Sequence, residues 1–218
     1  MGVTNKIVDL RKLLAQRFPH PTAPATSVLP TSIEFLDQVT VGGLPKNAIT
    51  ELISPRPSAG SASLIHTLVR SAQRDRHFVA LIDGSDSFDP GSSDNWALQH
   101  LLWVRCRKAI DAVKAADLLL RDGNFPLVIV DLALNAPEEL RKIPQTSWYR
   151  LQRLVEAVPS ACLVINRQSM VSSAQLKIVL ENSWTLADLE KESAVWHLRF
   201  RVQRSHLRSE AGQRSQIS

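Results

Sequence analysis

Residues 53–65, ISPRPSAGSASLI, lie between an apolar run and an amphipathic stretch, which is where an α/β protein binds phosphate. A working phosphate-binding loop has the form GxxxxGK[ST], in which the lysine contacts the β- and γ-phosphates and the hydroxyl binds Mg²⁺. This loop retains Gly60 but has Ser61 at the lysine position and Ala62 at the hydroxyl position. Phosphate charge would therefore rest on backbone N–H groups and on Arg56. We expect no nucleotide cofactor and no hydrolysis.

Two aspartates, Asp83 and Asp131, end apolar runs that are predicted to be strands. A carboxylate at a strand end can bind a metal ion, but it can equally cap the turn that follows, and we favour the capping interpretation for both. The six histidines are scattered, with no serine or acid at triad-like positions, so hydrolase chemistry has no support. The cysteines have no second ligand at metal spacing, and we expect no metal site.

The elements that would position this loop follow from the hydrophobic pattern. Apolar runs of four to six residues alternate with helical stretches, which predicts strands buried on both faces and hence an α/β fold with a mostly parallel sheet. The main predicted helices are 32–40, 61–74, 108–123 and 146–158. The predicted strands are 48–53, 77–83, 101–106, 125–131 and 161–167. Residues 176–186 and 195–203 alternate instead, which predicts an antiparallel hairpin at the sheet edge.

The second strand of this hairpin separates apolar from basic residues. Alternation places Trp196 with Leu198, Phe200 and Val202 on a face that we expect to join the core. The opposite face carries Arg199 and Arg201. The net charge of +5 is concentrated from residue 199 onward, where one acid, Glu210, accompanies five arginines: Arg199, Arg201, Arg204, Arg208 and Arg214. Such an end can contact DNA or an acidic protein surface, or it can be a solvated tail.

The N-terminal region differs from the rest of the chain. Residues 4–18 predict an amphipathic helix with one apolar stripe, which includes Leu10, Leu13 and Leu14. The Pro-, Thr- and Ser-rich stretch 19–32 predicts an extended linker. The helix would therefore be tethered, and it can dock on a partner or pack against its own core. The predicted organisation is 1–29 for the helix and linker, 30–203 for the core and 204–218 for a basic tail.

Composition is consistent with an ordinary soluble protein: 44% of the 218 residues are hydrophobic and 22% are charged. No apolar run approaches the length of a membrane span, and the N-terminus has no signal-peptide pattern. Cys106 and Cys162 lie far apart in apolar segments, which predicts buried free thiols in a reducing cytoplasm.

Four segments, in order, resemble the core of the bacterial RecA recombinase. Residues 30–55 resemble the lead-in to the RecA phosphate loop, with its GGLP turn, and LIDGSDSFDP at 81–90 resembles FIDAEHALDP. LVIVDL at 127–132 is similar to the Walker B strand, and ACLVINR at 161–167 is similar to the strand that ends in the Asn-Gln sensor. The resemblance implies a RecA-like core of the P-loop NTPase type, with Asp131 at the Walker B aspartate.

The same resemblance also locates departures from RecA. Ser85 stands at the catalytic glutamate position, and Arg167 follows Asn166 at the sensor glutamine position. Together with the loop changes, this implies that Arg56, Gly60, Ser61 and Asp131 form a vestigial nucleotide site that contains no catalytic residue. Residues 167–175 are too few for the long loop with which RecA holds single-stranded DNA.

Two RecA-like families lack ATP chemistry. The loop segment ELISPRPSAGSASLIHTLV and the stretch LLWVRCRKAIDAVKAADLLLRDGNFPLVIVD resemble ImuA, the accessory protein of SOS mutagenesis cassettes. This resemblance implies a scaffold in translesion DNA synthesis whose partners are a Y-family polymerase homologue (ImuB-like), an error-prone C-family DNA polymerase and RecA. The alternatives are a SulA-like inhibitor that binds FtsZ and an atypical ATPase. An oligomer and direct DNA binding are left open.

Overall fold

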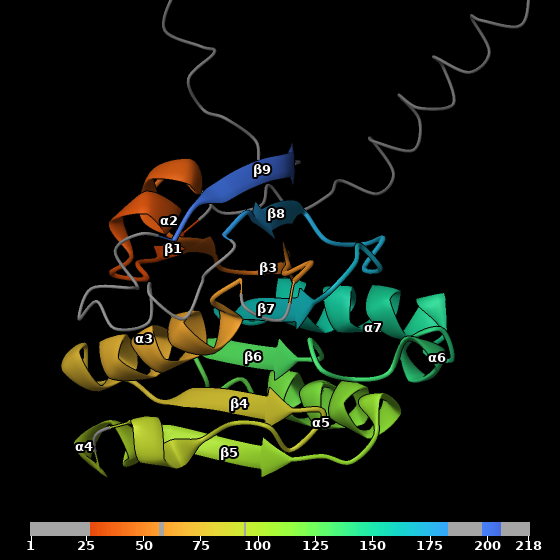
Figure 1. Ribbon diagram of the computed structural model, residues 1–218, viewed down its shortest axis with the longest axis horizontal. Helices are drawn as coiled ribbons and strands as arrows, with labels where there is room; N and C mark the ends of the chain where they lie inside the picture. The colour runs from red at the N-terminus through yellow and green to blue at the C-terminus, as the bar shows by residue number, and fades with distance from the viewer. Residues whose placement is uncertain (1–26, 57–58, 94, 183–197, 206–218) are drawn as a thin grey trace, which may run out of the picture.

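The computed structural model describes residues 27–56, 59–93, 95–182 and 198–205, which form a layered α/β fold (Figure 1). A seven-stranded sheet has the order β5-β4-β6-β7-β3-β8-β9, and every neighbouring pair except β8–β9 is parallel. Its strands are β3 (Ala48–Ile53), β4 (Val79–Asp83), β5 (Leu101–Arg105), β6 (Leu127–Asp131), β7 (Ala161–Asn166), β8 (Leu176–Leu180) and β9 (Phe200–Ser205). The predicted fold class is confirmed.

Helices cover both faces of the sheet (Figure 1). Their bounds are α2 (Glu34–Val39), α3 (Ser61–Arg74), α4 (Asn95–Leu98), α5 (Ala109–Asp122), α6 (Pro137–Leu140) and α7 (Gln145–Glu156), with a 3-10 turn at Pro90–Ser92. Successive strand residues point to opposite faces of the sheet and so join two apolar clusters. Leu81 and Ile129 pack with α3 on one face, and Ile82 and Val130 pack with α5 and α7 on the other. None of the described helices is long and apolar enough to cross a membrane.

Local sequence signals set several of these bounds accurately. β3 and α3 begin and end at the predicted residues, 48–53 and 61–74. α5 ends where Gly123 adopts the left-handed conformation, with φ of 70°, which confirms the predicted glycine stop. The short elements α4 and α6 were not predicted, because four-residue helices carry too little periodicity to be recognised.

The end of the predicted linker belongs to the folded core. β1 (Val28–Leu29) pairs antiparallel with β2 (Leu44–Pro45). Gly43, in the GGLP turn, has a φ of 139°, and a Cβ at this position would lie 2.2 Å from the carbonyl oxygen of Leu29. Only glycine allows this close approach of the two segments. The predicted helix at 4–18 lies outside the described residues.

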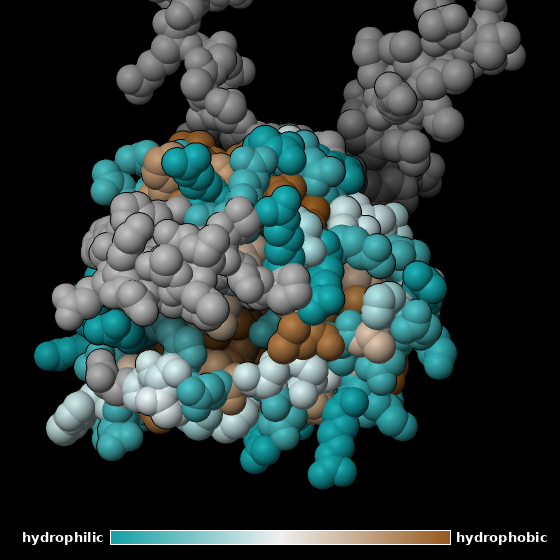
Figure 2. Space-filling model, in the orientation of Figure 1, coloured by the Kyte–Doolittle hydropathy of each residue, from teal (hydrophilic) through white to brown (hydrophobic). Residues whose placement is uncertain are grey.

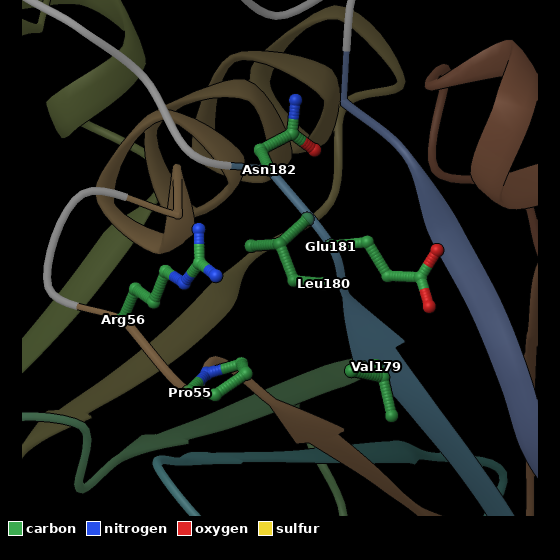
Figure 3. A pocket seen from close by; sticks show the side chains of 6 residues that line it. All are labelled: Pro55, Arg56, Val179, Leu180, Glu181 and Asn182. Atoms are coloured by element: carbon green, nitrogen blue, oxygen red, sulfur yellow. The ribbon is translucent and has the colours of Figure 1, made fainter.

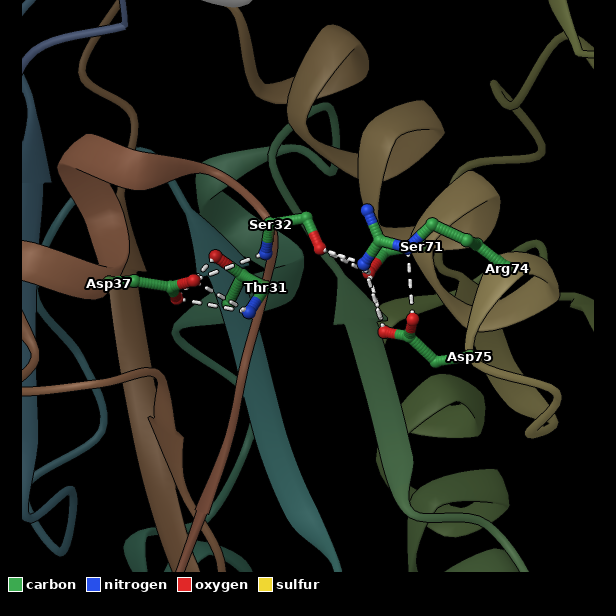
Figure 4. Close-up of polar contacts among 6 residues, drawn as sticks. All are labelled: Thr31, Ser32, Asp37, Ser71, Arg74 and Asp75. Atoms are coloured by element: carbon green, nitrogen blue, oxygen red, sulfur yellow. Dashed lines mark hydrogen bonds and ion pairs between the residues drawn. The ribbon is translucent and has the colours of Figure 1, made fainter.

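Hydrogen bonds also fix the residues that follow β1 (Figure 4). The Asp37 carboxylate accepts bonds from the backbone N–H of Thr31 at 3.0 Å and of Ser32 at 3.1 Å. The Ser32 hydroxyl contacts the Ser71 hydroxyl at 3.0 Å and the Arg74 guanidinium, both on α3. The segment before α2 is therefore anchored to α3, and residues 28–32, the end of the predicted linker stretch 19–32, are part of the folded structure.

The predicted edge hairpin is confirmed in its pairing and its faces, although its strands are shorter than expected. β8 ends at Leu180, and β9 begins at Phe200 and continues to Ser205. Phe200 and the preceding Leu198 are buried, whereas Arg199 and Arg201 are exposed. The expected core position of Trp196 falls outside the described residues.

Both cysteines are buried free thiols, as predicted. Burial raises the pKa of the Cys162 thiol to about 12, and it also raises the pKa of Cys106. Because the thiolate is the reactive form, neither side chain is a nucleophile near neutral pH.

Candidate functional site

The loop between β3 and α3 occupies the position that the sequence predicted for phosphate binding. Gly60 is buried and precedes α3 with a φ of 98°, a left-handed conformation that favours glycine. Ser61 is the first residue of α3 and is partly buried. Arg56 is exposed at the start of the loop. The first turn of α3 contains no lysine or arginine, so its positive end is formed by backbone N–H groups.

Two carboxylates lie at the carboxyl ends of the parallel strands, on the side of the sheet that α3 covers. Asp83 ends β4 and Asp131 ends β6, and the two residues are direct neighbours in the parallel register. Leu81 and Ile129, two residues earlier, pack in the α3 cluster, so alternation places both aspartates on that side. β7 lies between β3 and β6 and ends there with Asn166. The predicted residues Gly60, Ser61 and Asp131 thus all lie at the carboxyl ends of the strands.

Asp83 organises the loop that follows β4. Its carboxylate accepts bonds from the backbone N–H groups of Ser87 at 2.8 Å, Phe88 at 2.7 Å and Ser85 at 3.3 Å. The indole N–H of Trp103 also lies 3.4 Å from it. The carboxylate is buried and its acceptor capacity is largely used, which confirms the turn-capping interpretation of Asp83.

Aromatic and ionic contacts hold the same loop against α3 and β5. The ring of Phe88 stacks on His66 of α3 at 4.8 Å and meets the edge of Trp103 at 5.4 Å. The Arg105 guanidinium lies 4.9 Å from the Trp103 ring centroid, and it binds both carboxylate oxygens of Asp86, at 2.5 and 2.7 Å. Ser85, at the position of the RecA glutamate, therefore lies in a loop whose path is held on two sides.

One serine does meet a histidine, which the sequence did not indicate. His66 Nδ1 and Ser93 Oγ are 2.6 Å apart, and burial lowers the pKa of His66. The nearby Asp89 carboxylate instead binds the backbone N–H of Gly91 and the hydroxyl of Ser92. Because an acid would have to orient the histidine, the described residues do not assemble a catalytic triad at this point.

Asp131 has an unusual environment for a carboxylate. It accepts one hydrogen bond, from the backbone N–H of Ala133 at 3.0 Å. Burial is the main reason that its pKa is raised to about 6; the bond from Ala133 acts in the opposite direction, and the negative charge of Asp83 adds a smaller upward contribution. A strand-end carboxyl with this pKa is largely ionised at neutral pH but protonated in mild acid.

We expect Asp131→Asn to stabilise the protein by about 2 kcal/mol near pH 7.5, and by much less near pH 4. The folded-state pKa of about 6 lies above the ordinary 3.8. The neutral carboxyl therefore favours folding below the unfolded-state pKa, and this advantage is lost as the pH rises through about 6. The amide retains an acceptor for Ala133 and never ionises. Urea unfolding at both pH values measures the stability of the variant relative to the unmodified protein, and an equal difference at the two pH values would contradict the raised pKa of Asp131.

A buried ion pair beside this site escaped the sequence analysis. Glu51 of β3 is completely buried, and its carboxylate lies 2.6 Å from Nζ of Lys177 on β8. It also accepts bonds from the backbone N–H groups of Met170 at 2.6 Å and Val171 at 2.8 Å, and from the Asn166 side-chain amide at 3.1 Å. This one carboxylate therefore holds the loop that follows β7, the loop that the sequence marked as too short for DNA.

The only signal of this pair in the sequence is a charged residue inside each of two apolar runs, AITELI and LKIVL. Buried charges in strands require a partner. Which charge pairs with which depends on the strand order, and this order is not encoded in either run alone.

A pocket of about 410 Å³ opens between the start of the loop and the end of β8 (Figure 3). The pocket is lined by Pro55, Arg56, Val179, Leu180, Glu181 and Asn182. Glu181 pairs with Arg201 of β9 at 2.5 Å, and the Asn182 side chain accepts a bond from the backbone N–H of Arg199 at 2.6 Å. The structure thus places Arg56 in one pocket with Glu181 and Asn182, two residues that contact Arg201 and Arg199.

The remaining predicted residues do not join this site. Arg204 is exposed farther along β9, opposite Lys177, and Arg167 is exposed after Asn166. Leu10, Leu13, Leu14 and Arg208 lie outside the described residues. Within the described ranges, no three His, Cys, Asp or Glu side chains are grouped as metal ligands would be.

Comparison with known proteins identifies the family. A family model described as the RecA N-terminal domain matches residues 21–142, more than half of the chain. The chain is 31% identical over 108 residues to Protein RecA of Clavibacter michiganensis subsp. michiganensis, which covers 48% of this chain and 30% of that protein. It is 28% identical over 118 residues to Protein RecA of Frankia alni, which covers 53% of this chain and 34% of the relative.

Protein RecA of Xanthomonas axonopodis pv. citri is 30% identical over 110 residues, covering 49% of this chain and 32% of its own length. The matches span about a third of each curated relative. The segment common to the family model and this chain contains the phosphate-loop position, both strand-end aspartates and the sheet edge where they meet. The chain therefore belongs to the RecA N-terminal domain family.

Proposed function

We propose that this protein is a RecA-like accessory protein that binds partners without hydrolysing ATP, and that it acts in translesion DNA synthesis after DNA damage. The observation that carries the proposal is the start of α3, where Ser61 and Ala62 stand at the lysine and Mg²⁺-ligand positions of a phosphate-binding loop. Without a cation in the first turn of the helix, the β- and γ-phosphates lose their main positive contact.

The surroundings of this loop support the same proposal. In-line attack of water on a phosphate needs a residue that orients or activates the water. Ser85 stands at the position of the RecA glutamate, and Asp83 is already engaged by the backbone of its own loop. Asp131 accepts the backbone N–H of Ala133, two residues later, which is the contact of a turn cap.

The proposed place in translesion synthesis comes from the similarity of two segments to ImuA. Its partners would be a Y-family polymerase homologue, an error-prone C-family polymerase and RecA. The exposed arginines Arg201 and Arg204 of β9, with Arg199 just before the strand, would supply a basic surface for a partner or for DNA. Leu198 and Phe200, which alternate with them, are buried and hold this segment against the core.

The first test is calorimetric titration of Mg-ATP into the full chain. We expect no saturable binding up to about millimolar ATP, because the missing lysine removes the strongest phosphate contact. A RecA protein measured under the same conditions is the control. Micromolar affinity for Mg-ATP would contradict the proposal and favour an atypical ATPase.

The second test is capture of purified partners by the immobilised full chain. We expect retention of the Y-family polymerase homologue and of RecA, and no retention of FtsZ. A charge-reversed variant, Arg199→Glu with Arg201→Glu, tests whether β9 contributes to this binding. Retention of FtsZ alone would replace the proposal with a SulA-like function.

A further inference from the structure

The outer surface of α2 and the turn after it exposes apolar side chains. Phe35 is 50% exposed and Val41 is 85% exposed, and both lie within one stretch of seven residues. Figure 2 shows an apolar area over α2 on the face in view. We call the exposed side chains of residues 34–41 the α2 surface. A large exposed apolar side chain is ordinary by itself, but two within seven residues, one on α2 and one in the turn that follows it, indicate a contact surface.

Val41 is also held in an unfavourable backbone conformation. Its φ of 58° lies in the left-handed region, which is costly for a β-branched residue. The turn is fixed by hydrogen bonds from the backbone N–H of Gly42 to the Asp37 carbonyl at 2.7 Å and of Thr40 to the Leu36 carbonyl at 2.9 Å. Asparagine or glycine would fit this turn better than valine. The valine is therefore better explained by a contact of its side chain than by the turn itself.

The α2 surface is acidic as well as apolar. α2 has Glu34 and Asp37 in its first turn and no basic residue in its last turn. Glu34 accepts a bond from the Gln38 amide, and Asp37 accepts bonds from neutral N–H and hydroxyl groups. Among the described residues neither carboxylate forms an ion pair. A matching segment would therefore be amphipathic and basic.

Residues 4–18 of the same chain have this chemistry. They contain four cations and one acid around a single apolar stripe. The cations are Lys6, Arg11, Lys12 and Arg17, the acid is Asp9, and the stripe is Ile7, Leu10, Leu13, Leu14 and Phe18. Both the apolar stripe and the net positive charge complement the α2 surface.

The tether also has the required length and starting point. The described chain begins beside this turn, because Val28 Cγ2 lies 3.4 Å from where a Cβ on Gly42 would be. Residues 19–27 can span up to about 30 Å when extended. A tether of this length that starts beside Gly42 is long enough to place residues 4–18 on the α2 of the same chain.

We propose that residues 4–18 dock on the α2 surface of the same chain through Phe35 and Val41. Docking buries Leu10, Leu13 and Leu14 against the core, so these side chains become available to a partner only when the segment is released. The inference does not depend on the proposed function, since it concerns only how the chain covers its own α2 surface.

Hydrogen-exchange mass spectrometry of the full chain tests this docking. We expect amides in residues 4–18 to be protected, and Phe35→Ser with Val41→Asn to reduce this protection about tenfold. Tyr149→Ser, at a side chain that is 54% exposed on α7, is the matched control and leaves it unchanged. Glu34→Lys, which keeps both apolar side chains, is expected to reduce the protection by a smaller factor.

Amides of α3 and α5 in the same samples report whether each variant remains folded. Unprotected amides at residues 4–18 in the unmodified chain would overturn the proposal, as would protection that no α2 variant changes. Protection that disappears on dilution would show docking on a second copy, and this result would also overturn the proposal.

Discussion

Glu51→Ala is expected to lower the free energy of unfolding by about 3–5 kcal/mol, because it leaves a buried lysine without its counter-charge. Lys177 is only 8% exposed and lies 2.6 Å from the Glu51 carboxylate. The variant also removes the acceptor for the backbone N–H groups of Met170 and Val171. Urea unfolding followed by circular dichroism at neutral pH measures the loss.

Glu181→Ala is the matched control for this prediction. Glu181 pairs with Arg201 on the neighbouring strand, but both side chains are about half exposed. Because solvent screens such a pair, we expect a loss of at most about 1 kcal/mol. Equal losses for the two variants would contradict the role given to Glu51. Replacing Glu51 with leucine and Lys177 with methionine together should recover only part of the loss, since the two backbone N–H groups remain without an acceptor.

Trp148→Ala is expected to destabilise the protein by about 3–5 kcal/mol through the cavity it leaves. Trp148 lies on the buried side of α7 and is completely inaccessible, within the cluster that α5 and α7 form with the sheet. Its backbone carbonyl also accepts a bond from the Ser173 hydroxyl, so α7 is tied to the segment before β8. Chemical unfolding of the variant gives the loss directly.

Two further variants separate packing from other effects of this substitution. The indole N–H of Trp148 has no hydrogen-bond partner among the described residues, so Trp148→Phe loses volume but no polar contact and should cost clearly less than alanine. Tyr149→Ala, at the next residue, removes a side chain that is half exposed and should change stability by about 0.5 kcal/mol or less. A large effect of Tyr149→Ala would show that the loss reflects the helix and not the cavity.

Both predictions concern the region around the loop after β7. Glu51 holds this loop from the sheet side, and Trp148 supports the α7 side of the same layer. The end of β7 is therefore surrounded by buried and hydrogen-bonded residues. Asn166, at this end, is completely buried. A short, anchored loop here supports the proposal that the protein acts through its outer surfaces.

The sequence alone determined the fold class, the bounds of β3 and α3, and the position of the altered phosphate loop. These features are local: a run of apolar residues predicts a buried strand, and a 3.6-residue period predicts a helix. Glycine favours the left-handed conformation that Gly60 adopts before α3 and Gly123 adopts after α5. The alternating burial of Leu198, Arg199 and Phe200 was predicted for the same reason, since the period of two is a property of any strand.

Only the tertiary structure decided which side chains meet. Asn166 and Ser169 reach Glu51 across 115 and 118 residues of sequence, and Lys177 joins them because β3 lies between β7 and β8. His66 meets Ser93, and Arg56 shares a pocket with Glu181, for the same reason. Strand order is set by the packing of the whole sheet, so no single segment encodes these contacts. The sequence located the altered loop, and only the fold showed which side chains surround it.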